Sequence, residues 1–243
     1  MMPLMRVLTA GASILLTACA DAATPLAPTE LDAPSLLASG IHGIAPPASS
    51  PGGRPYREWS AAWWQWALET PASLTPVLDP TGARCAEGQH GHVWFLAGSF
   101  GGDPIVRNCT VPRDKALFFP LINLAYFAFL NDPPETRTRK FIRSQVACIA
   151  DATFPRVKID GVPVPHPEQY LVRSTVFTIL LPADNVFGAT EADIPELTLS
   201  PVVDEGFYLF LSPRTPGKHT IRWQSASAAC GSSQDITYHL TVE

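Results

Sequence analysis

The sequence predicts a mainly β protein, an antiparallel β-sandwich of the jelly-roll type with two decorating helices and two disulfides. Short apolar or alternating segments recur from about residue 92 onward, separated by turns rich in Pro and Gly, which is typical of a sandwich. Only two segments show helical periodicity. Four cysteines lie between residues 85 and 230, and an even number suggests two bridges in an exported protein.

The N-terminal residues predict export and lipid anchoring. Arg6 precedes a short apolar stretch ending in Leu16-Thr17-Ala18-Cys19, which resembles the lipobox of bacterial lipoproteins. We expect residues 1–18 to be a signal peptide and Cys19 to carry the lipid; an ordinary signal peptide cut near Ala20 or Ala23 is the alternative. The apolar stretch is too short to span a bilayer. The prediction is therefore an exported, membrane-anchored lipoprotein, periplasmic or at the cell surface.

Composition divides the rest of the chain into a tether and one domain. Residues 19–55 are rich in Ala, Pro and Ser and contain few large apolar side chains. Such a segment cannot bury enough surface to offset its ordering entropy, so we expect a semi-stiff tether. Residues 56–243 have the size of one domain with a proper core. The formal net charge of −5, together with export, disfavours nucleic acid as a partner.

The first predicted helix runs from Tyr56 to Thr70 and carries a wide aromatic face. Pro55 suits its first turn. At about 100° per residue, the bulky side chains fall on one side and the polar ones opposite. Such a stripe usually faces the core, and we favour that interpretation; the alternative is a stacking platform for sugar rings or another flat ligand. The candidate ligand-binding residues are Trp59, Trp63, Trp64 and Trp66.

Three strands are predicted after this helix. Residues 92–98 form a short apolar run that predicts a buried strand, and residues 105–111 predict its returning partner. Residues 115–123 predict a core strand in which Pro120 marks a bulge, an edge or the strand's end. The aromatic residues that follow, up to Phe129, are expected to lie in a loop.

The second predicted helix begins at Asp132, with Glu135 completing a capping box, and is expected to end near Ala150. Its outward arc is basic. We interpret this arc as a solvated face, although it could also dock to lipid head groups or an acidic partner. The basic residues are Arg137, Arg139, Lys140 and Arg143.

From residue 157 to the end the pattern predicts strands and turns. Residues 157–164 predict a hairpin around Asp160-Gly161. Residues 174–181 and 206–211 predict further strands. Two alternating segments near the C-terminus predict a terminal hairpin with Cys230 in its loop.

Several stretches together resemble a family of uncharacterised secreted bacterial proteins. They are DPTGARCAEGQHGHVWFLAG, CTVPRDKALFFPLIN, VKIDGVPV and PGKHTI, which follow the helix containing WWQW. The resemblance extends over nearly all of the predicted domain. It implies a shared architecture and secretion, and no particular reaction.

The cysteines of the predicted domain allow three disulfide connectivities. We prefer Cys85–Cys109, which would tie a polar loop to the strand at 105–111, and this leaves Cys148–Cys230 as the second bridge.

No segment presents a complete catalytic constellation. His90 and His92 are candidate metal ligands, because a strand would direct both imidazoles to one face, but a catalytic zinc needs three protein ligands. The residues around Ser99 approximate a nucleophile elbow, yet another strand follows where that motif needs a helix. We expect no catalytic residue and no cofactor.

Three hypotheses about function follow. The leading one is a lipid-anchored binding or structural module of the bacterial envelope, with an accessory subunit of a membrane complex as its narrower form. The second is an envelope hydrolase, either glycan-acting or metal-dependent through the loop that holds His90 and His92. The third is a carbohydrate-binding protein that uses exposed tryptophans.

Overall fold

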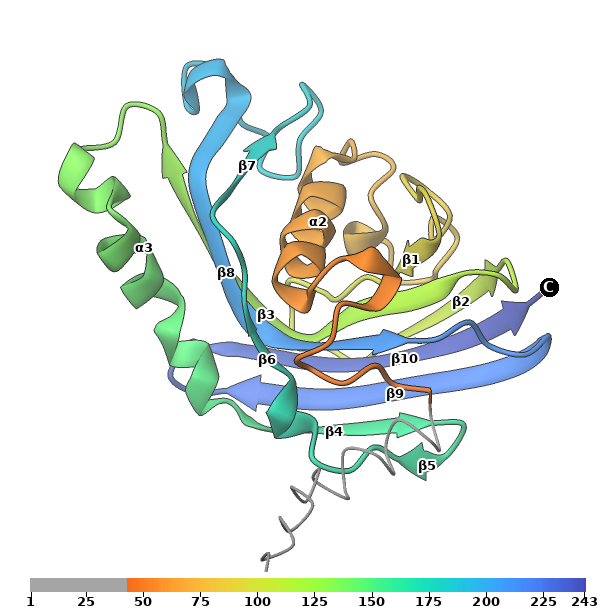
Figure 1. Ribbon diagram of the computed structural model, residues 1–243. Helices are drawn as coiled ribbons and strands as arrows, with labels where there is room; N and C mark the ends of the chain where they lie inside the picture. The colour runs from red at the N-terminus through yellow and green to blue at the C-terminus, as the bar shows by residue number, and fades with distance from the viewer. Residues whose placement is uncertain (1–42) are drawn as a thin grey trace, which may run out of the picture. The chain divides into compact units, whose positions relative to one another are not determined.

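The computed structural model describes residues 43–243, which form two packed β-sheets flanked by helices (Figure 1). The predicted signal peptide, the predicted lipidation site at Cys19 and residues 19–42 of the predicted tether lie outside the described residues. Among the described helices, none is long and apolar enough to cross a membrane.

The first sheet, sheet A, has two long central strands, β3 (Ala116–Phe129) and β8 (Thr198–Leu211), which pair with each other. The second sheet, sheet B, is built around the terminal hairpin of β9 (Gly217–Ser227) and β10 (Ser232–Val242). The remaining strands of sheet A are β1 (Val93–Phe95), β6 (Leu171–Arg173) and β7 (Phe177–Leu180), and those of sheet B are β2 (Ile105–Val111), β4 (Thr153–Ile159) and β5 (Val162–Pro163).

The sheets meet through aromatic side chains. Phe119 of sheet A packs on Trp223 of sheet B, with ring centroids 5.1 Å apart, and Trp223 stacks on Tyr238 at 5.9 Å. All three rings are buried to 1% exposure or less. The predicted sandwich, the hairpin around Asp160-Gly161 and the terminal hairpin are therefore confirmed.

One predicted strand pairing is wrong. The segment at 92–98 and the segment at 105–111 were expected to form a hairpin, but β1 pairs in parallel with β3 and β2 pairs in parallel with β10. The chain between them crosses from one sheet to the other. A connection that changes sheet brings both strands beside later segments, and local sequence does not encode that choice.

The long strand β3 contains the predicted irregularity at Pro120, where the register with β8 shifts between Pro120 and Ile122. The strand then continues to Phe129, so the loop predicted for these residues is wrong. The residues there pair with the first half of β8, which begins at Thr198, ahead of the strand predicted at 206–211.

The helix α2 (Tyr56–Glu69) has the predicted limits within one residue, and Pro55 occupies its N-cap position. All four candidate tryptophans are buried, with exposures of 3% to 7%. They pack against sheet A, as in the contact between Trp59 and Phe118 at 6.4 Å. The stripe is therefore a core face. Less than a tenth of each of these tryptophans is exposed, and Trp63, Trp64 and Trp66 also line hollows described below.

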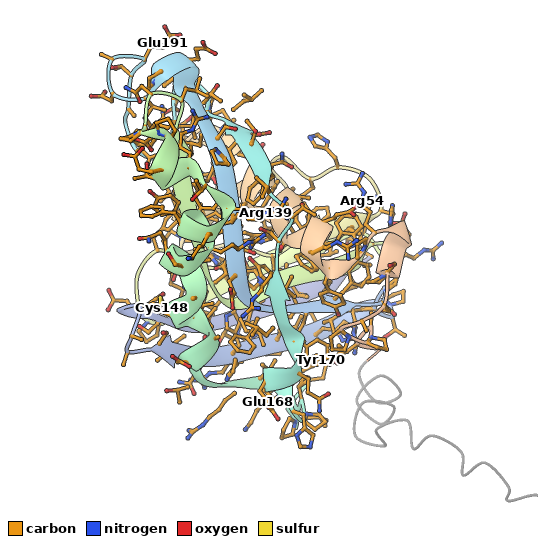
Figure 2. The ribbon with its side chains drawn as sticks, turned by 60° about the vertical axis from the view of Figure 1, so that its left-hand side comes forward. Arg54, Arg139, Cys148, Glu168, Tyr170 and Glu191 are labelled. Atoms are coloured by element: carbon orange, nitrogen blue, oxygen red, sulfur yellow. A yellow bond between two sulfur atoms is a disulfide. The ribbon has the colours of Figure 1, made fainter. Side chains whose placement is uncertain are left out.

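The helical region after β3 is broken into η3 (Pro134–Arg137), α3 (Arg139–Val146) and η4 (Ala147–Asp151). Thr138, not Asp132, caps α3 by accepting from Phe141 N at 3.3 Å, whereas Asp132 accepts from Phe129 N in the preceding turn. Figure 2 shows Arg139 at the beginning of α3 and Cys148 beyond its end.

The basic arc, which extends over η3 and α3, is only partly solvated, and this corrects the prediction. Arg143 donates to Asp204 O at 3.1 Å and also to Ser174 O. Arg137 donates to Leu130 O at 3.0 Å. Both guanidinium groups therefore donate to main-chain carbonyls of neighbouring segments, and α3 lies on the outer side of the bent sheet, opposite α2 (Figure 1).

The preferred disulfide pairing is confirmed: Cys85 bonds Cys109, and Cys148 bonds Cys230. The folded region begins earlier than predicted. Ile44 is buried to 1% and bridges Leu211, and Tyr56 OH donates to Ala45 O at 2.7 Å. Residues 43–55 therefore belong to the domain and not to the predicted tether.

Candidate functional site

A carboxylic acid lies fully buried at the centre of sheet A. Asp204, in the middle of β8, has 0% exposure, and its neighbour Glu205 has 2%. Successive residues of a strand point to opposite faces, so the two carboxylates lie on opposite faces of the sheet. Figure 1 shows α2 and α3 on those two sides.

The Asp204 carboxylate is held by side chains from two elements. Trp64 Nε1 of α2 and Tyr208 OH of β8 each donate to Asp204 Oδ1 at 2.8 Å. Asn123 of β3 extends the network by donating from Nδ2 to Tyr208 OH at 2.9 Å. The second carboxylate oxygen, Asp204 Oδ2, is buried without a hydrogen-bond partner. These residues are called the Asp204 network below.

Burial decides the protonation of Asp204. Desolvation raises the pKa of its carboxyl from an ordinary 3.8 to about 7, although hydrogen bonds from Trp64 and Tyr208 and the charge of Arg143 favour the ionised form. The same burial, with the Asp204 charge nearby, raises the pKa of Tyr208 well above 10.0. A carboxyl with a strongly raised pKa beside a hollow is a candidate functional group.

The other face of the strand is a charge cluster. Arg173 Nε lies 3.1 Å from Glu205 Oε2, while Glu205 Oε1 is buried without a hydrogen-bond partner. Arg143 is the second cation of the cluster, and it donates a hydrogen bond to the main-chain oxygen of Asp204. Two cations thus accompany the two buried acids, as buried charges require.

A hollow of about 190 Å³ opens beside the Asp204 network. Trp64 and Asn123 belong to both, so the walls of the hollow are hydrogen-bonded directly to the network. Phe100 stands at the hollow with 59% exposure. The remaining lining is aromatic, apolar or neutral and polar, and comprises Trp63, Val77, Gly98, Ser99, Leu124, Ser232 and Gln234.

The polar groups of the hollow are set in place by the chain itself. Gln234 accepts from Ser99 N at 3.0 Å and donates to Ser99 O at 2.6 Å, which ties the loop after β1 to the start of β10. Trp63 Nε1 donates to Leu96 O at 3.0 Å. Aromatic surface with a few positioned neutral polar groups is suited to binding a small neutral polar group.

The predicted candidate residues are distributed over different places. Trp63 and Trp64 line the hollow, Trp66 lines a separate groove, and Trp59 packs in the core. His90 lines that same groove, whereas His92 lies 3.2 Å from Gly52 O and packs edge-on against Trp59.

The expectation that both imidazoles share a strand face is wrong. Gly91 has a φ of 68°, so residues 90–92 form a turn before β1 and the alternation of a strand does not apply. Within residues 43–243, no group of three or more His, Cys, Asp or Glu side chains could hold a metal ion.

Other pairs that resemble catalytic groups have structural partners. His219 lies 2.9 Å from Asp160 through Nδ1, but its Nε2 is 2.8 Å from Thr215 O. A general base needs one ring nitrogen free for the substrate, and here both are occupied. Ser99 Oγ donates to Gly101 O at 2.6 Å, so this hydroxyl is not bonded to a base.

Sequence reasoning missed Asp204, Glu205, Asn123 and Gln234. A signal for the acids is present: Asp204-Glu205 interrupts a run of large apolar residues from Val202 to Leu211, where a strand inside the core would not ordinarily place two charges. Nothing comparable marks the two amides.

Comparisons with known proteins add little. No protein-family profile matches this sequence, and no curated protein matches it. Among solved structures, a cysteine protease inhibitor from Entamoeba histolytica aligns with 63% of this chain and 100% of its own, at 11% sequence identity and a TM-score of 0.23. A similarity this low carries no argument about fold or function.

Proposed function

We propose that this protein is an exported, lipid-anchored binding module of the bacterial envelope, which holds a ligand or a protein partner in the hollow beside α2. The lipobox-like sequence at Cys19 supports the anchor. Two disulfides support an oxidising compartment outside the cytoplasm. The resemblance to a family of secreted bacterial proteins agrees with this location.

The Asp204 network is the observation that carries the binding function. It places a buried acid behind a hollow, yet gives that acid no route to a substrate: Asp204 is fully buried and its bonded oxygen already accepts from Trp64 and Tyr208. Such an acid orients the Trp64 indole, which lines the hollow, and the Tyr208 phenol, which accepts from the lining residue Asn123. Walls held in this way lose little entropy when a ligand arrives, which favours binding.

The hollow suits a small occupant. Its volume of about 190 Å³ lies below the roughly 300–1,000 Å³ of sites for larger ligands. Its lining contains no charged residue. A single neutral ring, or one neutral side chain of a protein partner, fits these properties. A partner's side chain is the occupant that the accessory-subunit form of the proposal requires.

Phe100 provides the test, since it is exposed and its removal leaves the core intact. Cross-linking in native cells, followed by purification through a C-terminal tag, should recover a partner at near-equal stoichiometry from the wild type and lose it with Phe100→Ala. Phe187→Ala is the matched control, because Phe187 is 49% exposed and lies outside the hollow.

Three results would contradict the proposal. Equal recovery from both variants would remove the hollow from the interaction. Reproducible turnover by the purified protein, lost on mutation in the hollow, would identify an enzyme instead. Recovery of the protein alone, with no tryptophan fluorescence change across a panel of neutral sugars and peptides, would leave the proposed binding function without a ligand and refute it.

A further inference from the structure

A second concavity lies along the C-terminal half of α2. This groove has a volume of about 470 Å³ and shares no lining residue with the hollow. Helix α2 contributes Trp66 and Glu69, the segment after it contributes Leu74, and the loop before β1 contributes Glu87 and His90. The inference drawn from it is independent of the proposed function.

The base of the groove is aromatic and rigid. Trp66 and Phe95 have ring centroids 5.5 Å apart, and Trp66 Nε1 donates to Glu87 O at 3.0 Å. Gln89 fixes the loop to β1, because its side-chain amide accepts from Phe95 N and donates to Phe95 O, both at 2.8 Å. The fold thus presets the arrangement of the rings.

Glycine at position 88 keeps the groove in this form. Its φ of 66° is a left-handed conformation that disfavours other residues. A Cβ there would lie 2.8 Å from Thr70 Oγ1 and 3.1 Å from Trp66 Cδ1. The loop therefore approaches the indole as closely as a residue without a side chain permits, which brings Glu87 and His90 to the rim.

The charge of the groove is one-sided. Glu69 and Glu87 both line it, and no lining residue is Lys or Arg. Glu69 Oε1 accepts from Leu180 N at 3.1 Å, and desolvation raises the pKa of the Glu69 carboxyl. Within residues 43–243 no hydrogen bond or ion pair involves the Glu87 carboxylate. Aromatic faces and unneutralised carboxylates are both attractive to a cation.

We propose that this groove binds a small organic cation, an amine or quaternary ammonium group, against the Trp66 and Phe95 rings with Glu69 and Glu87 as the countercharges. Phe95 is partly exposed and offers ring surface to the ligand. Delocalised or methylated cations are held by such rings because they are weakly hydrated.

The test compares choline with 3,3-dimethylbutan-1-ol, a neutral ligand of the same shape, by calorimetric titration of the full chain in detergent. Choline is expected to bind at least ten-fold more tightly than the alcohol. Glu69→Gln/Glu87→Gln should weaken choline binding at least ten-fold and leave the alcohol unchanged. Gln retains an acceptor for Leu180 N, so the helix and β7 stay joined. Glu135→Gln/Glu191→Gln, an equal change of charge outside the groove, should bind as the wild type does.

Equal affinity for the two ligands, or equal loss of binding in both double variants, would overturn the inference. No binding of choline at millimolar concentration would also overturn it. Raising the pH should tighten choline binding, because desolvation raises the pKa of the Glu69 carboxyl and a higher pH ionises it more completely. None of these outcomes bears on the hollow, whose test uses Phe100.

Discussion

Replacing Asp204 by Asn tests the buried network most directly. The amide keeps the shape of the side chain and an Oδ1 acceptor for Trp64 and Tyr208. It changes Oδ2, which has no hydrogen-bond partner in the native chain. The protonated acid and the amide both place a donor at that position. We therefore expect Asp204→Asn to fold, and to differ from the wild type chiefly in how its stability depends on pH.

The direction of that dependence follows from the raised pKa. Below about pH 4 the carboxyl is protonated in both folded and unfolded chains and leaves the free energy of unfolding unchanged. As the pH rises from about 4 to about 7, the unfolded chain releases a proton that the folded chain retains. The free energy of unfolding of the wild type then falls by roughly 1.4 kcal/mol per pH unit.

The total follows from the two pKa values. The pKa of Asp204 rises from 3.8 to about 7, so the accumulated destabilisation reaches roughly 4 kcal/mol and is complete above that pH. Asp204→Asn carries no such penalty. The free energy of unfolding of Asp204→Asn should therefore rise relative to that of the wild type as the pH increases. Loss of a stabilising ion pair would have the opposite effect.

Urea unfolding of the oxidised full chain, followed by tryptophan fluorescence, measures the effect. Between pH 5 and pH 8 the free energy of unfolding of Asp204→Asn should rise relative to the wild type by roughly 2–3 kcal/mol. Asp114→Asn is the control, because its side chain is 74% exposed, and it should follow the wild type at both pH values. A difference between Asp204→Asn and wild type that is the same at pH 5 and pH 8 would refute the reasoning.

Three further predictions concern the fold. Replacing both cysteines of Cys148–Cys230 by Ser should lower the free energy of unfolding by about 4.5 kcal/mol, and the same change at Cys85–Cys109 by about 3.5 kcal/mol. The first loss is larger because that bridge joins cysteines 82 residues apart, and the second joins cysteines 24 residues apart. A larger loss for Cys85–Cys109 in denaturant titrations would contradict the loop-closure argument. Thr138→Ala should cost about 1 kcal/mol through loss of the α3 cap, with Ser restoring it; equal stability of all three proteins would contradict the assignment. Desolvation opposes ionisation of Asp160, but hydrogen bonds, the largest from His219, outweigh it and lower the pKa of the carboxyl. The free energy of unfolding of the wild type should therefore fall more steeply below about pH 4 than that of Asp160→Asn. Parallel acid-unfolding curves would show that the Asp160 carboxylate does not stabilise the fold.

Much of the fold follows from local physics that the sequence contains. The aromatic stripe of α2 repeats at helical period, so one face had to be buried whatever it packs against. Alternation in β9 and β10, with a short connection of four residues that ends in Gly231, favours an antiparallel hairpin. The bulge at Pro120 follows from the missing N–H. The disulfide pairing was predicted because Cys85–Cys109 would tie a polar loop to the strand at 105–111, which left Cys148–Cys230 as the second bridge.

Long-range packing decided the rest. Whether residues 105–111 pair with the preceding strand or cross to sheet B depends on which partners the closed sandwich leaves free. The helical pattern predicts that Arg143 is exposed to solvent, but in the fold its guanidinium donates to the main-chain carbonyls of Asp204 and Ser174.

The candidate site belongs entirely to tertiary structure. Trp64 and Asp204 are 140 residues apart in the chain and meet at 2.8 Å. The sequence by itself determined that two acids interrupt an apolar strand; only the fold decided that one of them, Asp204, faces α2 and is fully buried. Burial by distant elements, rather than the residue type, is what raises the pKa of Asp204 and makes the hollow beside it a candidate site.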